Sequence, residues 1–322
     1  MMVRKNDSYI KVLKEEDIPA PLGLYTTYVQ PVNQSLQGSI LILHGMQEHS
    51  GRYIEFAEYL ADIGFAVLLY DHIGHGKTVT EETMQGYFQQ KRPQDRLIQD
   101  AIGLHRYLKN KHPMLPHFII GHSMGSFITR CVVQRIGAEF DGSVWIGTGA
   151  KTSGAEAFKA LLSFLNKIRP RERSNWVNGI FSKMNNRRFR HEEDFDDTSW
   201  LSLSKENRKR FKEDDLCGIP FTNNAFHSLL SLVLLATKRG WQHSIPRSLP
   251  LLLVSGQDDP IGNFYKGIKK TEEQLRNSGF KDVTVKTYPQ KRHEILQEDN
   301  RQDVFTDIGQ WLLLHAKSVP IQ

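Results

Sequence analysis

A serine between two glycines follows a short apolar run and opens a predicted helix. The motif G-H-S-M-G occupies residues 121–125, and the apolar pattern predicts a helix over 126–134. Side chains at Gly121 or Gly125 would collide with the strand or the helix that such a tight turn joins. The N-terminus of a helix also favours developing negative charge. The pattern predicts a nucleophile elbow that presents Ser123, which is the chemistry of a serine hydrolase.

A serine hydroxyl needs a base in contact with it and a carboxylate that orients the base. In folds with this elbow, the acid and then the histidine follow the serine along the chain. Asp259 comes just after a predicted strand at 251–254, and His293 comes just after another at 283–288. Because catalytic groups gather at the carboxyl ends of parallel strands, we expect Ser123, Asp259 and His293 to meet there.

Two positions of this predicted triad have alternatives. Asp258 could orient the base in place of Asp259, which is favoured because it lies three residues after Gly256, the usual spacing for this loop. His315 is the other late histidine. It falls inside a predicted terminal helix, where a packed or solvated side chain is expected, so His293 is favoured.

Two backbone N–H groups are expected to hold the negative oxygen of the reaction intermediate. One belongs to Met124, the residue after the serine. The other is expected from the loop after the predicted strand at 38–43, where His44, Gly45 and Met46 follow. Gly45 allows the backbone to turn, so that the amide of Met46 faces the serine.

The elements that must position these residues alternate between strand and helix. The inner strands are short, continuous apolar runs, which is typical of a parallel sheet covered on both faces. The predicted fold class is therefore α/β, with a mostly parallel central sheet flanked by helices. Strands are predicted at 8–12, 24–28, 38–43, 66–70, 117–120, 142–146, 251–254 and 283–288, and helices at 52–63, 92–109, 126–134, 264–278 and 304–317.

The alternation stops between residues 150 and 247. This stretch is helical and too long for one crossover, so it is predicted to be a helical cap, or lid, inserted into a core of 1–149 and 248–322. Two apolar stripes in it either pack into the core or line a pocket for a lipid chain. Between 151 and 247 there are 18 Lys and Arg against 11 Asp and Glu. The excess indicates either a solvated face or transient contact with an anionic membrane surface.

The composition is that of an ordinary globular protein, with 322 residues, 39% hydrophobic and 24% charged. No signal peptide or membrane-spanning run is visible, so a cytoplasmic enzyme is expected.

Cys131 and Cys217 are the two cysteines, and neither has the spacing of a metal ligand. We expect no metal and no cofactor, and the absence of nucleic-acid-binding motifs predicts no nucleic-acid partner. The sequence makes no prediction of oligomeric state.

Longer motifs carry a family resemblance. The run H-G-M-Q-E-H-S-G-R-Y at 44–53, D-H-I-G-H-G at 71–76, the G-H-S-M-G elbow and R-H-E-I-L at 292–296 resemble the monoacylglycerol lipase and lysophospholipase group of α/β-hydrolases, which has a serine aminopeptidase S33-like domain. The segments 198–202 and 215–222 resemble bacterial members. The resemblance implies the same triad, the same two amides and an apolar acyl pocket roofed by the cap. In the family Arg-Asp usually follows Trp-Leu-Ser, where this chain has Leu203 and Ser204.

The predicted function is a serine ester hydrolase that cleaves single-chain lipid esters, monoacylglycerols or lysophospholipids, through an acyl-enzyme. One alternative is an aminopeptidase or amidase of the same fold, in which acidic cap residues would bind a free amino group. Another is a non-catalytic module that binds a membrane surface, against which an intact triad argues. The acidic residues in question are Glu192, Glu193, Asp194, Asp196 and Asp197.

Overall fold

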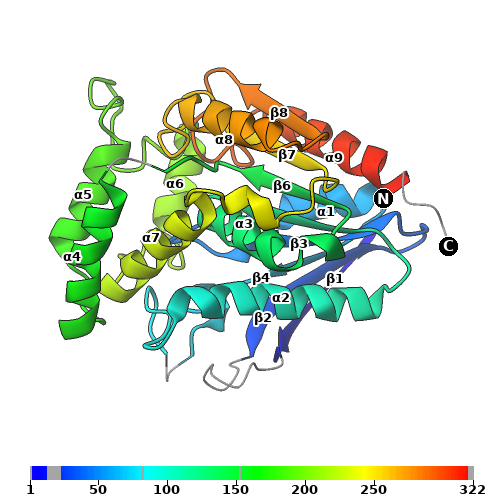
Figure 1. The fold of residues 1–322 in the computed structure, drawn as a ribbon, viewed down its shortest axis with the longest axis horizontal. Helices are drawn as coiled ribbons and strands as arrows, with labels where there is room; N and C mark the ends of the chain where they lie inside the picture. The colour runs from blue at the N-terminus through cyan, green and yellow to red at the C-terminus, as the bar shows by residue number, and fades with distance from the viewer. Residues whose placement is uncertain (1, 13–22, 81–82, 152–153, 318–322) are drawn as a thin grey trace.

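The described part of the chain is built on one eight-stranded sheet (Figure 1). The computed structural model describes residues 2–12, 23–80, 83–151 and 154–317. The strand order is β1-β2-β4-β3-β5-β6-β7-β8. The strands are β1 (Val3–Ile10), β2 (Leu24–Pro31), β3 (Gly38–Leu43), β4 (Phe65–Tyr70), β5 (His117–His122), β6 (Gly142–Ile146), β7 (Leu251–Gly256) and β8 (Val283–Tyr288).

Strands β3 to β8 are parallel, and β1 and β2 add an antiparallel edge. All residues of β3, β4, β5, β6 and β7 are buried, which explains their continuous apolar runs. The sequence prediction was wrong for β1, which covers 3–10 and not 8–12. This edge strand is mostly exposed and polar, so no apolar pattern marks it, although it pairs with β2 over its whole length.

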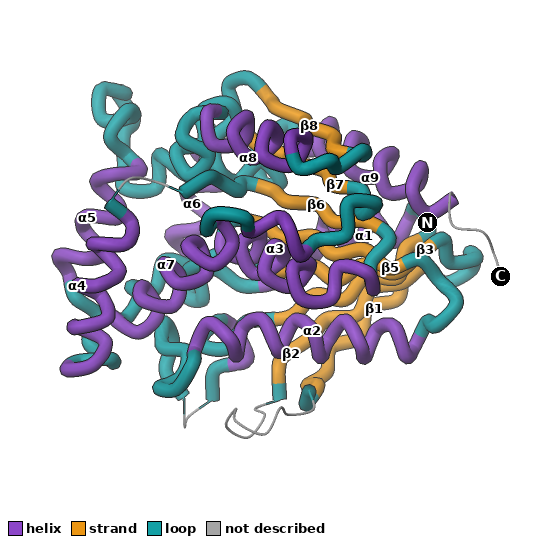
Figure 2. Tube along the Cα trace, in the orientation of Figure 1, coloured by secondary structure: helices purple, strands orange, loops and turns teal. Residues whose placement is uncertain are grey.

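Helices cover both faces of the sheet (Figure 2). Alternate strand residues point to opposite faces, so Leu41 packs with one layer of helices and Ile40 with the other. The first layer contains α2 (Pro93–Lys111), α3 (Met124–Ile136) and α8 (Lys266–Asn277). The second contains α1 (Ile54–Asp62) and α9 (Arg301–Lys317). This doubly covered, mostly parallel sheet confirms the predicted α/β class.

In the described residues between β6 and β7 there are four further α-helices, within the stretch predicted to be a cap. They are α4 (Ala155–Ile168), α5 (Asn175–Asn185), α6 (Lys205–Glu213) and α7 (Asn223–Thr237). Helix α7 packs against α3, α2 and α4, whereas α4 and α5 form the left end of the molecule in Figure 1. We refer to residues 154–247 of the structure as the insert. Within the described ranges, no helix has both the length and the apolar character needed to cross a membrane.

Candidate active site

Ser123 lies in a strained turn between β5 and α3. Its backbone has φ 53° and ψ −120°, a conformation that costs a non-glycine residue free energy and is found at functional sites. A Cβ atom at Gly121 would clash with the carbonyl oxygen of Gly125, and one at Gly125 would clash with that of Leu43. The two glycines are therefore required by close backbone packing, as the sequence predicts for an elbow.

Two loops from neighbouring strands flank the serine. The N–H of Ser123 donates to the carbonyl oxygen of Ile146 at 2.9 Å, which fixes the elbow to the end of β6. On the other side, a Cβ at Gly45 would lie 3.1 Å from the Cβ of Ser123. Ser123 is only 7% exposed, so the site is covered in this structure.

Asp259 and His293 form the pair that the sequence predicts. Both carboxylate oxygens of Asp259 lie 3.0 Å from Nδ1 of His293, and both residues are buried. Oδ1 of Asp259 also accepts the N–H of Ile261 at 2.8 Å, which fixes the carboxylate. The proton on Nδ1 leaves Nε2 of His293 as an acceptor, and within the described ranges Nε2 has no hydrogen-bond partner. An imidazole in this state can accept a proton from a hydroxyl group.

The alternative residues lie elsewhere. Asp258 is exposed and lines a surface cavity that His293 does not line. His315 lies in α9, where it bonds the carbonyl oxygen of Trp311 at 2.7 Å and the carboxylate of Asp282 at 2.9 Å. The structure thus brings together Asp259 and His293, the pair favoured from the sequence.

The imidazole of His293 lies between two other rings. The ring centroid of His122, the residue before the serine, is 4.8 Å away, and that of Trp200, from the insert, is 5.0 Å away. A Cβ at Gly147, which has φ +59°, would lie 3.0 Å from Cε1 of His293 and 3.4 Å from Oδ2 of Asp259. These contacts place the elbow, the β6 loop and the insert around a single imidazole.

The turn after β3 is fixed by its own side chains. The N–H of Gly45 donates to Oε1 of Glu48 at 2.6 Å. Nε2 of His44 accepts the N–H of His72 at 3.0 Å, so Nδ1 of His44 carries the proton and donates to the carbonyl oxygen of Gly45 at 2.8 Å. Burial lowers the pKa of His44 well below its usual value, which keeps the ring neutral. Met46 therefore follows a rigid turn beside the serine.

Met124 is the first residue of α3. The first N–H groups of a helix have no intrahelical acceptor and carry part of the positive end of its dipole. The amide of Met124 therefore has the right chemistry to stabilise a negative oxygen next to Ser123.

Sequence reasoning missed a buried charge network beside the site. Arg52 binds Glu48 at 2.7 Å and both carboxylate oxygens of Glu294 at 2.5 and 2.8 Å. Asn207 of α6 donates to Glu294 at 2.7 Å. Burial alone would raise the pKa of Glu48, but its hydrogen bond with His122 and the charge of Arg52 hold it well below its usual value. The network links the Gly45 turn, the His293 loop and the insert. The motifs at 44–53 and 292–296 contain three of these residues, but only the coordinates show that they meet one another and Asn207.

The His293 loop is also tied to the insert through its backbone. Arg292 forms an ion pair with Glu192 and donates to the carbonyl oxygen of Ser199 at 2.5 Å. The N–H of Glu294 donates to the carbonyl oxygen of Leu201 at 2.7 Å. The insert segment that carries Trp200 is therefore held against the catalytic loop on both sides.

The departure from the family pattern at Leu203 and Ser204 has a structural role. The N–H groups of both residues donate to the carboxylate of Glu298, at 2.9 and 3.1 Å. The hydroxyl of Ser204 donates to Asp299 at 2.7 Å and accepts the N–H of Asn207, which caps α6. These residues anchor the insert to the chain that follows His293.

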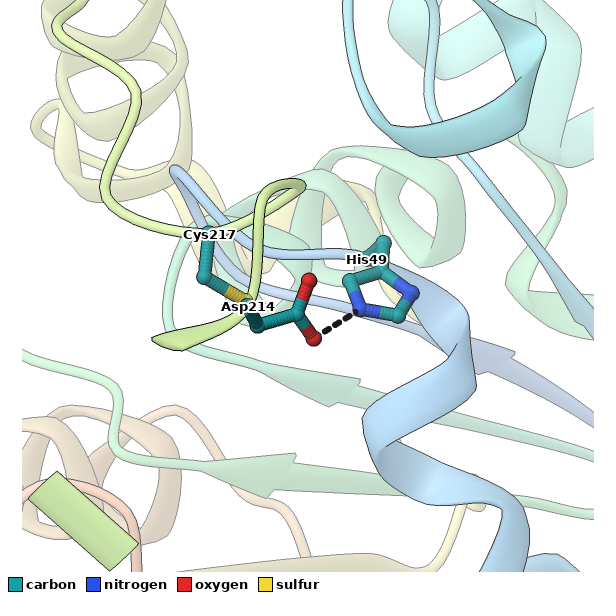
Figure 3. Close-up of side chains that lie close together, drawn as sticks. All are labelled: His49, Asp214 and Cys217. Carbon is teal, nitrogen blue, oxygen red and sulfur yellow. Dashed lines mark hydrogen bonds and ion pairs between the residues drawn. The ribbon is translucent and has the colours of Figure 1, made fainter. Parts of the chain in front are cut away.

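A second contact between core and insert involves His49, Asp214 and Cys217 (Figure 3). Nε2 of His49 donates to Asp214 at 2.8 Å, while Nδ1 accepts the N–H of Gly51 at 3.2 Å. Because the ring proton lies on Nε2, this nitrogen has no lone pair for a metal ion. Burial raises the pKa of Cys217, which keeps it a thiol. The side-chain N, O and S atoms of the three residues lie within 4.8 Å of one another. Because His49 and Cys217 keep their protons, the group is a hydrogen-bonded contact between core and insert and is not suited to bind a metal ion.

Aromatic side chains of the insert form a continuous series next to the site. The series runs from His75 of the core to His293, with successive ring centroids 5.0 to 5.8 Å apart. Its members from the insert are Phe221, Phe226, Phe181 and Trp200.

A separate cavity of about 470 Å³ lies between the insert and the Asp258 loop; Ser123 and His293 do not line it. The insert thus supplies a row of aromatic rings that ends at the imidazole of His293, and the outer cavity lies apart from that imidazole.

The fold and the site together define an α/β-hydrolase. The chain belongs to the Hydrolase_4 family, described as serine aminopeptidase S33, whose model matches residues 34–300. The predicted resemblance is therefore confirmed.

Proteins that match most of the chain include lipases. The monoacylglycerol lipase of Mycolicibacterium smegmatis is 25% identical over 289 residues, which cover 87% of this chain and 89% of that protein. A monoglyceride lipase homolog of monkeypox virus is 35% identical over 106 residues, which cover 33% of this chain and 36% of that protein. A solved lipase structure in its open form is 26% identical, with a TM-score of 0.86, and covers 97% of this chain and 99% of that one.

Proposed function

We propose that this protein is a serine ester hydrolase that cleaves single-chain lipid esters, with monoacylglycerols as its main substrates. The observation that carries the proposal is the Asp259 carboxylate on Nδ1 of His293, which leaves Nε2 as a free acceptor on a ring that packs against His122, the residue before the strained elbow serine. This pairing of a base and an orienting acid is the arrangement that activates a serine.

In the proposed mechanism, His293 takes the proton of Ser123 as its oxygen attacks the ester carbonyl. The amides of Met46 and Met124 hold the tetrahedral oxyanion, and one such donor contributes on the order of 3 kcal/mol. His293 then protonates the leaving glycerol, and an acyl-enzyme remains. Water attacks this ester with His293 again as base, and Asp259 keeps the imidazole in the required tautomer. The steps need no metal ion or cofactor.

The substrate class is inferred from the insert and from the relatives. We propose that residues 150–247 act as a cap over a core of 1–149 and 248–322. The aromatic series from Phe221 to Trp200 gives the cap a row of apolar rings that ends at His293, which suits an acyl chain. The names of the matched relatives favour monoacylglycerols. Lysophospholipids also have one acyl chain and are proposed as further substrates.

We further propose that the cap contacts anionic membranes transiently. Large apolar side chains are exposed on both α4 and α5, and lysines and arginines accompany them. Apolar side chains with basic neighbours bind the interface of an anionic bilayer. The exposed apolar residues are Leu161, Phe164, Ile168, Trp176, Ile180 and Met184.

The aminopeptidase alternative is not favoured. A free amino group would need unpaired carboxylates, yet Glu192 pairs with Arg292 and Asp194 pairs with Arg208. Asp196 pairs with Lys212 at 2.9 Å. Three of the five acidic residues considered are therefore already neutralised by ion pairs.

A hydrolysis panel tests the proposal. Monoacylglycerols, lysophosphatidylcholines of matched acyl length and aminoacyl-naphthylamides are compared with the wild-type protein and with Ser123→Ala. We expect the glycerol esters to be cleaved fastest and the variant to be inactive. A folded Ser123→Ala protein that still cleaves p-nitrophenyl esters would remove Ser123 from the mechanism, and a preference for naphthylamides would overturn the substrate class.

A further inference from the structure

His122, the residue before the serine, is buried between the two halves of the site. It is 4% exposed. One ring nitrogen faces the loop that carries His293, and the other faces Glu48 and Tyr53, which belong to the turn after β3. The ring of His122 is not part of the triad, so its hydrogen bonds must be explained separately.

The partner of Nε2 fixes one proton. Nε2 of His122 lies 3.1 Å from the backbone carbonyl oxygen of His293. A carbonyl oxygen can only accept a hydrogen bond. Nε2 must therefore carry a proton and donate it.

The partners of Nδ1 fix a second proton. The phenol of Tyr53 donates its single proton to Oε1 of Glu48 at 2.7 Å. Burial and the neighbouring carboxylate raise the pKa of Tyr53, so this proton stays on the phenol. Nδ1 of His122 lies 2.6 Å from the Tyr53 oxygen and 3.3 Å from Oε1 of Glu48. When the phenol proton is donated to Glu48, the Tyr53 oxygen is an acceptor toward Nδ1, and the carboxylate oxygen can only accept. With a neutral ring, the single phenol proton would have to serve both Nδ1 and the carboxylate, and two acceptor atoms would face each other across one of these short contacts. A proton on Nδ1 removes this conflict.

The charges of the surrounding network agree with this count. Glu48 and Glu294 are two buried carboxylates, and Arg52 supplies one positive charge between them. An imidazolium at His122 makes the group neutral, whereas a neutral ring would leave one buried negative charge uncompensated. Buried charges are costly unless they are paired and hydrogen-bonded.

We propose that His122 is held as an imidazolium at neutral pH and is a positioning residue for the active site. Its Nε2 proton holds the backbone of His293, and its Nδ1 proton holds Tyr53 and Glu48. Glu48 in turn holds the N–H of Gly45. A single charged ring therefore fixes the distance between the base and the turn that carries the Met46 amide. The positioning role rests on the proposed function, whereas the charge state does not.

The charge state predicts a dependence on pH. Burial alone would lower the pKa of His122, but the hydrogen bond and the charge of Glu48 outweigh burial and raise it. A raised pKa means that the interaction is complete below the ordinary pKa of histidine and is lost as the pH rises through the raised pKa. The titratable and charged groups around the ring are Glu48, Tyr53, His293, Arg52 and Glu294.

The experiment combines histidine NMR with kinetics. Wild-type protein with ¹⁵N-labelled histidine is titrated from pH 6 to 10, and His122→Asn assigns the signal by its loss. We expect both ring nitrogens of His122 to be protonated at pH 7. We also expect kcat for a monoacylglycerol to fall in the alkaline range with the same midpoint as the NMR titration. In His122→Asn, kcat should fall about 100-fold with a small change in KM, since misplacement of catalytic groups by about 1 Å has an effect of that size.

The control is His117→Asn, which changes another buried histidine of β5. Its Nδ1 bonds Ser39, and burial lowers its pKa to about 4, so it is a neutral ring distant from the serine. We expect kcat close to the wild-type value in this variant. A neutral tautomer of wild-type His122 at pH 7 would overturn the proposal whatever the kinetics show. A charged ring in a protein that cleaves no ester would instead refute the proposed function, and a charged ring with unchanged kcat in His122→Asn would refute the positioning role.

Discussion

Gly147→Ala is the perturbation whose effect is best defined by the structure. Gly147 follows β6 with φ +59°, and an added methyl group would lie 3.0 Å from Cε1 and 3.1 Å from Nδ1 of His293. Both distances are shorter than ordinary carbon contacts of about 3.5–4.0 Å, so the imidazole must shift by about 0.5 Å. The left-handed backbone conformation costs a further 1–2 kcal/mol, approximately, for alanine.

Two measurements separate these effects. The free energy of unfolding, from urea denaturation, should fall by about 1–2 kcal/mol because of the backbone. The kcat for a monoacylglycerol should fall about 10-fold or more because the base is displaced, with 100-fold expected for a shift of about 1 Å.

Gly240→Ala is the matched control. Gly240 has φ +74°, and its added methyl group would lie 3.1 Å from Nδ1 of His243, in a turn outside the site. This variant should lose similar stability and keep its kcat. Wild-type activity in a folded Gly147→Ala protein, or an equal loss of activity in Gly240→Ala, would refute the assignment of His293 as a closely packed base.

Three other predictions concern the choice of the acid, the exposed surface of α4 and the buried Cys131. Asp259→Asn should lower kcat by about 10⁴-fold because the imidazole loses its required tautomer, while Asp258→Asn should leave kcat unchanged; comparable losses in both would reopen the choice of acid. Phe164→Asp, on exposed α4, should lower the rate on monoacylglycerol in anionic vesicles but not on a water-soluble ester, and equal rates on vesicles would contradict the membrane contact. Cys131, whose pKa burial raises to about 12, should resist iodoacetamide at neutral pH until the protein is denatured, and rapid labelling of the native protein would contradict its burial.

The elements of the core could be predicted from the sequence because their signals are local. Buried parallel strands are continuous apolar runs, and the elbow needs glycine at two fixed positions, so β3 to β7 and the turn at Ser123 follow from residue types. Asp259 and His293 could be chosen because each follows a strand in the expected order. Strand β1 could not be predicted in register, because its position depends on pairing with β2 and not on its own pattern.

The charged network could not be predicted because its members are distant in the chain. Arg52 and Glu294 are separated by 242 residues and meet only through the packing of the His293 loop. The same is true of Trp200, whose ring meets His293 because Arg292 and Glu294 bind the backbone of the insert on either side. Such contacts depend on tertiary structure, for which no spacing rule exists.

The most direct test of the triad is the site of covalent modification by a fluorophosphonate, measured by mass spectrometry of the digested protein. We expect a single adduct on the peptide that contains Ser123, formed rapidly in the wild-type protein and lost when His293 is replaced by alanine. An adduct on another residue, or an unchanged labelling rate in His293→Ala, would contradict the assembly of these side chains into one catalytic site.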